Sequence, residues 1–145
     1  SITQAATLSV TDDPLWGEWE AFESYGHPIG EWQITYIDGC NDLISFSYVI
    51  FDETLILTES NISIQSHGTF KEYDYTGLDQ INCTYEELSI EEKPDNGSLF
   101  GTYTIEANNL IVETTGGNGS LGYTFQGSNT LIITNEGEVF KYTRK

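Results

Sequence analysis

The stretch Pro14-Leu15-Trp16-Gly17-Glu18-Trp19-Glu20-Ala21 decides how this 145-residue chain folds. Its odd-numbered positions are apolar or glycine, whereas its two glutamates share the other parity. Such a period of two is typical of a β-strand that buries one face. The last stretch of the chain with a similar pattern, residues 140–144, ends on the only arginine, Arg144. We therefore expect the first and last strands to be partners.

Short alternating segments fill the chain between these two ends, and no segment has a convincing helical period. Asp52-Glu53 interrupts one of them, His67-Gly68 is a hairpin signal, and residues 93–97 form the clearest turn. Short strands at intervals of roughly 8–12 residues predict a sandwich or a barrel, and hairpin-only connections favour the barrel. We expect an all-β, antiparallel, up-and-down β-barrel of about 8–10 strands. The segments with a strand-like pattern are residues 15–25, 32–36, 44–50, 54–58, 62–66, 69–75, 81–85, 88–90, 99–105, 110–114, 121–125, 131–133 and 140–144.

The pattern Leu15-x-Gly17-x-Trp19, with Arg144 at the end of the last strand, resembles the lipocalin (calycin-like) barrels. More specifically, it resembles the small lipocalin-like domains of bacterial envelope proteins, and the likeness covers about residues 15–144. This resemblance implies that Trp19 closes one end of the barrel and that Arg144 lies across its ring, a contact of roughly 0.5–2 kcal/mol. It also implies that the protein binds a small hydrophobic or neutral molecule non-covalently.

Aromatic side chains dominate the parity that we assign to the barrel interior. A barrel of about eight strands is either filled by its own side chains or wide enough for one small ligand. We expect a pocket with apolar walls and a few tyrosine hydroxyls that orient the guest, and a filled core is the alternative. The expected ligand-binding residues are Trp32, Tyr36, Phe46, Tyr48, Tyr85, Tyr103, Tyr123 and Phe125.

The charge of the chain limits its partners. With a net charge of −18 and only five basic residues, the sequence argues against nucleic acid and against an anionic membrane surface. No apolar run is long enough to span a membrane. Because Arg144 is expected at Trp19, a buried anionic guest would lack a cation, so a neutral, apolar or cationic guest fits better.

Cys40 and Cys83 are the only cysteines, and their spacing excludes a CxxC pair. They are either two buried thiols or one disulfide, and we favour the disulfide, which implies an oxidising compartment. We expect the protein to lie outside the cytoplasm, either in a bacterial periplasm, as a lipoprotein tethered to the outer membrane, or as a secreted protein. Residues 1–13 are expected to form a tether or capping segment, and residues 14–145 the barrel domain.

Signals for catalysis are weak. The sequence has no nucleophile elbow, zinc-protease motif or phosphate loop, and His27 and His67 stand in turn-like sequence. We therefore expect no catalytic residue, no metal and no cofactor. Two other classes stay open: a surface module that binds a partner protein or glycan through exposed aromatics, with Trp16 the main candidate, and an enzyme on a barrel scaffold.

Overall fold

The computed structural model describes residues 13–145, so the expected tether lies, apart from Asp13, outside the described residues. The described chain forms eleven β-strands, no helix, and only antiparallel strand pairs. Within residues 13–145 no helix is therefore long and apolar enough to cross a membrane. The strands are β1 (Gly17–Ser24), β2 (His27–Pro28), β3 (Gln33–Ile37), β4 (Cys40–Leu57), β5 (Asn61–Thr76), β6 (Glu87–Pro94), β7 (Gly97–Glu106), β8 (Asn109–Thr114), β9 (Gly117–Gln126), β10 (Thr130–Asn135) and β11 (Glu138–Arg144).

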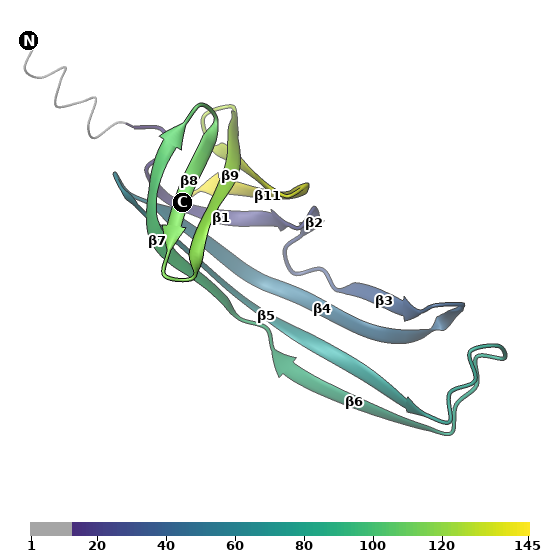
Figure 1. The fold of residues 1–145 in the computed structure, drawn as a ribbon. Helices are drawn as coiled ribbons and strands as arrows, with labels where there is room; N and C mark the ends of the chain where they lie inside the picture. The colour runs from purple at the N-terminus through teal and green to yellow at the C-terminus, as the bar shows by residue number, and fades with distance from the viewer. Residues whose placement is uncertain (1–12) are drawn as a thin grey trace, which may run out of the picture.

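Eight of these strands close into a barrel, which confirms the expected fold class (Figure 1). The pairings run β1-β11-β10-β9-β8-β7-β5-β4, and β4 returns to β1 with Trp19 opposite Leu55. The first and last strands are partners, with Trp19 opposite Arg144. Closure leaves these eight strands without a free edge over the length of the barrel.

One end of the barrel, the closed end, is filled by the stretch that opens the sequence. Trp19 is fully buried, its indole nitrogen donates to the carbonyl of Leu15 at 3.0 Å, and the Arg144 guanidinium lies 4.1 Å from its ring centroid. The guanidinium also donates to the carbonyl oxygens of Trp16 and Pro14. The expected contact between Trp19 and Arg144 is therefore present, and it ties the chain before β1 to the last strand.

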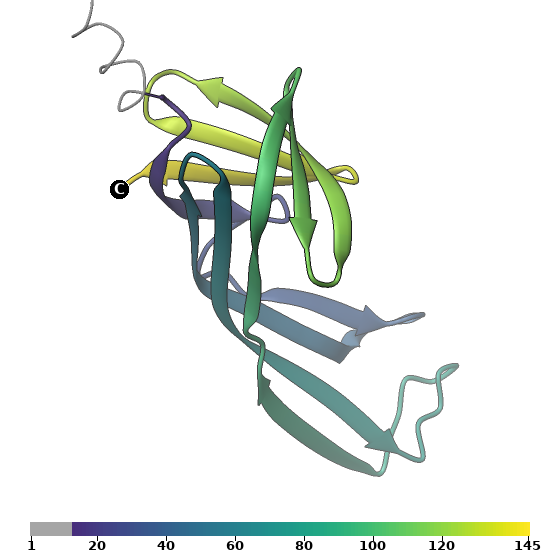
Figure 2. The same cartoon turned by 60° about the vertical axis from the view of Figure 1, so that its left-hand side comes forward.

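A second part of the molecule extends from the opposite end of the barrel, which we call the mouth (Figures 1 and 2). There β4 and β5 continue past the barrel wall and pair with β3 and β6, so that the sheet order is β3-β4-β5-β6. We call residues 32–50 and 68–94 the arm. The expected disulfide joins Cys40 and Cys83 at the far end of the arm, with their Cα atoms 5.5 Å apart.

Two breaks expected from the sequence are wrong, and both fall where strands pass from barrel to arm. Asp52-Glu53 does not interrupt β4, because a register shift between Ile50 and Asp52 absorbs the change of parity. His67-Gly68 is not a hairpin but the middle of β5. Glycine is needed there because a Cβ at position 68 would clash with the carbonyl oxygen of Val49.

Two further expectations about the arm are wrong. The turn at residues 93–97 does not reverse the chain, because β6 and β7 both pair with β5 and follow one another along it. Residues 81–85 are not a strand but part of the loop at the arm's end. There the Asp79 carboxylate accepts hydrogen bonds from the backbone of Ile81 and from Asn82. Local turn chemistry, together with the disulfide, overrides the alternation of apolar residues in this loop.

Candidate ligand site at the barrel mouth

The structure does not bring the eight expected ligand-binding aromatics into one cavity. The expectation that they share the barrel interior is wrong, because the sheet extends beyond the barrel and alternation alone cannot show where the barrel ends. Three of them belong to barrel strands: Tyr103, Tyr123 and Phe125. Five belong to the arm: Trp32, Tyr36, Phe46, Tyr48 and Tyr85.

The three barrel aromatics pack toward the closed end as core. The ring of Phe125 lies 6.2 Å from that of Trp19 and 6.1 Å from that of Tyr123. Tyr103 is buried, and its hydroxyl donates to the carbonyl of Thr58 at 2.5 Å. A satisfied hydroxyl and close ring contacts are what a filled core requires. This half of the barrel is therefore packed with side chains.

Toward the mouth, the barrel interior opens into a cavity of about 230 Å³, which we call the mouth cavity. Its walls are formed by apolar side chains from β5, β7, β9, β10 and β11. The polar groups include the carboxylate of Glu53, the hydroxyl of Tyr142, and the side chains of Ser66, Ser98 and Asn135. The main apolar lining residues are Ile64, Leu99, Leu121, Ile133 and Phe140.

Glu53 is the most unusual residue in this cavity, because it is an acidic residue of which only 5% is exposed. Ser24 of β1 donates a hydrogen bond to one of its oxygens at 3.2 Å, and Tyr142 of β11 donates to the other. Among the residues that the structure describes, every buried side-chain nitrogen and oxygen has a hydrogen-bond partner. The carboxylate is therefore held by two hydroxyls, with no Lys or Arg among the residues that line the cavity.

Burial raises the pKa of Glu53 above its ordinary value, and the hydrogen bonds from Tyr142 and Ser24 oppose that rise. The pKa of Tyr142 is raised as well, first by burial and then by the nearby charge of Glu53, so this hydroxyl keeps its proton and remains a donor. The two hydroxyls thus stabilise the ionised carboxylate, while its surroundings disfavour it.

Sequence reasoning missed Glu53 as a site residue, although the signal was present. Glu53 has the parity of Leu55 and Leu57, which both point into the barrel. The pair Asp52-Glu53 predicts a break instead, because two adjacent acidic residues rarely belong to a buried strand. Only the partners supplied by β1 and β11, both distant in sequence, make a buried glutamate acceptable at this position.

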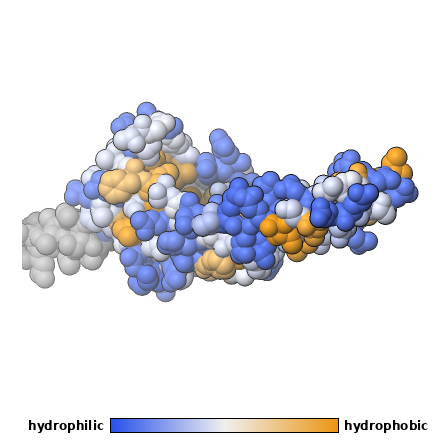
Figure 3. Space-filling model, turned by 90° about the horizontal axis from the view of Figure 1, so that it is seen from below, coloured by the Kyte–Doolittle hydropathy of each residue, from blue (hydrophilic) through white to orange (hydrophobic). Residues whose placement is uncertain are grey.

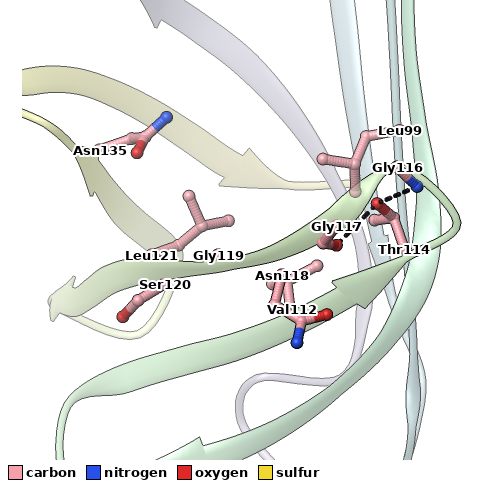
Figure 4. A pocket seen from close by; sticks show the side chains of 10 residues that line it. All are labelled: Leu99, Val112, Thr114, Gly116, Gly117, Asn118, Gly119, Ser120, Leu121 and Asn135. Atoms are coloured by element: carbon pink, nitrogen blue, oxygen red, sulfur yellow. Dashed lines mark hydrogen bonds between the residues drawn. The ribbon is translucent and has the colours of Figure 1, made fainter.

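A second hollow of about 340 Å³ adjoins the mouth cavity and shares Leu99, Leu121 and Asn135 with it (Figure 4). One side is the glycine-rich hairpin between β8 and β9. The Thr114 hydroxyl holds this turn by donating to the carbonyl of Gly117 at 3.0 Å and accepting from the Gly116 amide. Because Gly116, Gly117 and Gly119 have no side chains, this side of the second hollow is open to solvent.

One face of the arm continues the surface of the mouth. Tyr25 and Ile50 line the mouth cavity and also a hollow on the arm that contains Tyr48 and Phe70. Beyond them the ring of Phe46 stacks on Phe70, with 5.6 Å between their centroids. We call this the mouth-side face. Phe46 and Tyr48 thus lie beside the mouth, although outside the barrel.

The opposite, outer face of the arm carries exposed apolar and aromatic side chains. In the strand register Ile34, Ser47 and Lys71 lie in one row, and the next residues on this face, Tyr73 and Ile90, oppose each other. The ammonium of Lys71 lies 4.8 Å from the ring centroid of Trp32. Figure 3 shows apolar residues gathered on the arm, apart from those of the barrel. The exposed fractions reach 46% for Ile34 and 54% for Ile90.

The structure also places Trp16, considered above as an interaction residue, and the two histidines, considered above for catalysis. Trp16 is not the exposed aromatic we expected, because it is half-buried against the core at the closed end. His67 contacts Asp52 at 2.5 Å on the surface, whereas His27 lies in the two-residue strand β2. The described residues contain no cluster of three or more His, Cys, Asp or Glu side chains that could hold a metal.

Comparison of the chain with protein-family models, with curated proteins and with solved structures found no match. The class that the structure itself defines is a closed, eight-stranded antiparallel β-barrel with a disulfide-linked, four-stranded extension at its mouth.

Proposed function

We propose that this protein is an exported binding protein that holds a small molecule non-covalently at the mouth of its barrel. The observation that carries this proposal is the mouth cavity, with its apolar walls and the hydrogen-bonded Glu53 carboxylate within it. Small-molecule sites typically combine apolar walls with a few convergent polar groups, and barrel mouths are a common place for them.

The size of the cavity limits the guest. Its volume of about 230 Å³ is below the range of roughly 300–1,000 Å³ that is usual for drug-sized ligands. The guest is therefore of the size of one aromatic ring with a short substituent, and a longer molecule extends into the adjoining hollow beside β8 and β9.

The disulfide between Cys40 and Cys83 supports export, because such bonds persist in oxidising compartments. The bacterial periplasm, an outer-membrane-tethered lipoprotein and a secreted protein are the forms of export that we propose. Each of them exposes the chain to small solutes outside the cytoplasm.

Native mass spectrometry of the purified protein, compared with denatured spectra, tests the proposal first. A non-covalent adduct that is lost on denaturation would give the mass of the guest. The second test is titration with a panel of neutral one-ring probes. Two variants of the same strand are compared: Leu99→Trp fills the cavity, whereas Phe100→Trp adds the same side chain on the outer wall of the barrel. We expect L99W to weaken binding at least tenfold and F100W, at a position 73% exposed, to leave it unchanged. Absence of both an adduct and any probe binding would contradict a carrier function.

A second candidate function rests on the outer face of the arm, which is exposed and apolar and belongs to no part of the barrel. Contiguous apolar surface of this kind is typical of sites that bind another protein. Photo-cross-linking from position 90 on this face, compared with position 100 on the barrel wall, tests it in the native envelope. A discrete adduct from position 90 alone supports a partner protein, and equal labelling from both positions argues against one.

A further inference from the structure

The electrostatic character of the mouth cavity indicates which class of molecule it takes. Glu53 is buried, yet each of its oxygens accepts only one hydrogen bond from the described residues. A carboxylate has about four acceptor positions, so each oxygen can accept one more hydrogen bond. A donor that enters the cavity therefore finds a preorganised acceptor, held in place by Ser24 and Tyr142.

All five basic residues of the chain lie within residues 13–145, and none of them is placed to neutralise this carboxylate. Arg144 lies on Trp19 at the closed end, and Lys71 lies on Trp32 in the arm. The three remaining lysines contact surface glutamates: Lys93 with Glu91 at 3.4 Å, Lys141 with Glu23 at 3.5 Å, and Lys145 with Glu18 at 3.2 Å. Every basic side chain therefore has another partner.

Aromatic rings and further negative charge surround the entrance. Tyr25 packs edge-on against Phe140, with 4.7 Å between their centroids, and both residues line the cavity. Asp95 lines the adjoining hollow together with Tyr25 and Tyr48. Burial raises the pKa of Tyr48, and the charges of the nearby Glu138 and Asp95 carboxylates add to that rise. Aromatic faces and a negative potential both favour an entering cation.

We propose that the mouth cavity selects small organic amines, whose ammonium group pairs with Glu53 while their apolar part packs against Leu99, Leu121 and Ile133. This inference rests on the proposed carrier function and gives its ligand class. An ammonium supplies the missing positive charge, and charge-assisted hydrogen bonds are roughly twice as strong as neutral ones. An anion of the same shape meets a buried carboxylate with no cation to offset it.

Three probes of matched shape test the proposal: 2-phenylethylamine, 2-phenylethanol and 3-phenylpropanoate. Isothermal titration calorimetry at pH 7 is expected to show the amine binding at least tenfold more tightly than the alcohol, and the anion more weakly than both. Glu53→Gln is expected to remove the advantage of the amine over the alcohol. Glu106→Gln, at an exposed position at the end of β7 away from the mouth, changes the net charge of the protein by the same amount and is expected to leave that advantage within twofold.

The outcomes separate the two proposals. Equal affinity for amine and alcohol in the wild-type protein overturns the amine inference and leaves the carrier function standing. The amine inference is likewise overturned if E53Q folds, as shown by circular dichroism, and retains the preference for the amine. If these three probes fail but neutral one-ring probes bind, the ligand class is wrong. If no probe of any kind binds, both proposals fail.

Discussion

The hydroxyl of Tyr142 donates a hydrogen bond to the carboxylate of Glu53, and this contact links β11 to β4 inside the barrel, although the two strands do not pair. Between them runs β1, which contributes the second donor, Ser24. The contact marks the boundary between the packed, closed half of the barrel and its open mouth. The Glu53 carboxylate therefore lies where the packed interior of the barrel borders the mouth cavity.

Glu53 is expected to make stability depend on pH in a defined direction. Because its pKa is higher in the folded chain than in the unfolded chain, the folded state binds this proton more tightly, and the ionised group costs stability at neutral pH. That cost disappears as the pH falls through the folded pKa toward the unfolded value of about 4.5. Glutamine never ionises, so the stability of Glu53→Gln relative to wild type is expected to decrease from pH 7 to about pH 4.5.

Urea denaturation of both proteins across this pH range measures that difference, and taking a difference removes the effect of the many surface carboxylates. Glu106→Gln, at an exposed position at the end of β7 away from the mouth, is the control for the substitution itself. A flat difference for E53Q would mean that Glu53 titrates as an ordinary surface glutamate.

Trp19→Ala is expected to lower the free energy of unfolding by about 3–5 kcal/mol, because it removes a fully buried ring and leaves a cavity under Arg144. Trp32→Ala is the matched control, since that ring is 39% exposed and also lies beside a cation, Lys71. Its cost is expected to be below about 1 kcal/mol. Denaturant unfolding measures both, and equal costs would show that Trp19 does not close the barrel.

Gly68→Ala is expected to destabilise the protein by about 1–3 kcal/mol, because the new methyl group would clash with the Val49 carbonyl where β4 and β5 leave the barrel. Gly116→Ala tests glycine loss without a clash, since its nearest neighbour would be a Thr114 side-chain atom at 3.8 Å. Thermal melts followed by circular dichroism compare the two. A melting temperature for G68A equal to that of G116A would contradict a close approach at the junction.

Reduction of the Cys40–Cys83 bond is expected to loosen the arm and to leave the barrel intact, since the bridge lies at the far end of the arm. A loop of this length contributes roughly 4 kcal/mol in the chain-entropy model. Hydrogen exchange with and without reductant is expected to show faster exchange confined to β3 and β6 and to the arm portions of β4 and β5. Loss of protection in β9, β10 and β11 would show instead that barrel and arm unfold together. Thiol counting of unreduced, denatured protein is expected to find no free thiol.

The sequence by itself determined the local character of this protein. Alternation with a period of two sets which residues of each strand face inward, so the all-β class could be predicted. The contact of Trp19 with Arg144 was expected from the resemblance of Leu15-x-Gly17-x-Trp19 and Arg144 to lipocalin-like barrels, and the structure contains it. Two cysteines without CxxC spacing left either two buried thiols or one disulfide, and the structure contains the favoured disulfide. These features depend on residue type and position along the chain.

Only the tertiary structure decided where the barrel ends and what lies at its mouth. Alternation is the same in a strand that closes a barrel and in one that extends from it, so Trp32, Tyr36 and Phe46 could not be assigned to the arm in advance. The parity of Glu53 points into the barrel, yet the sequence could not show that the residue is tolerated there, because a buried carboxylate is acceptable only when distant strands bring Ser24 and Tyr142 to it. Pairing between distant segments determines both where the barrel ends and which groups surround Glu53. Periodicity within one segment carries no information about that pairing.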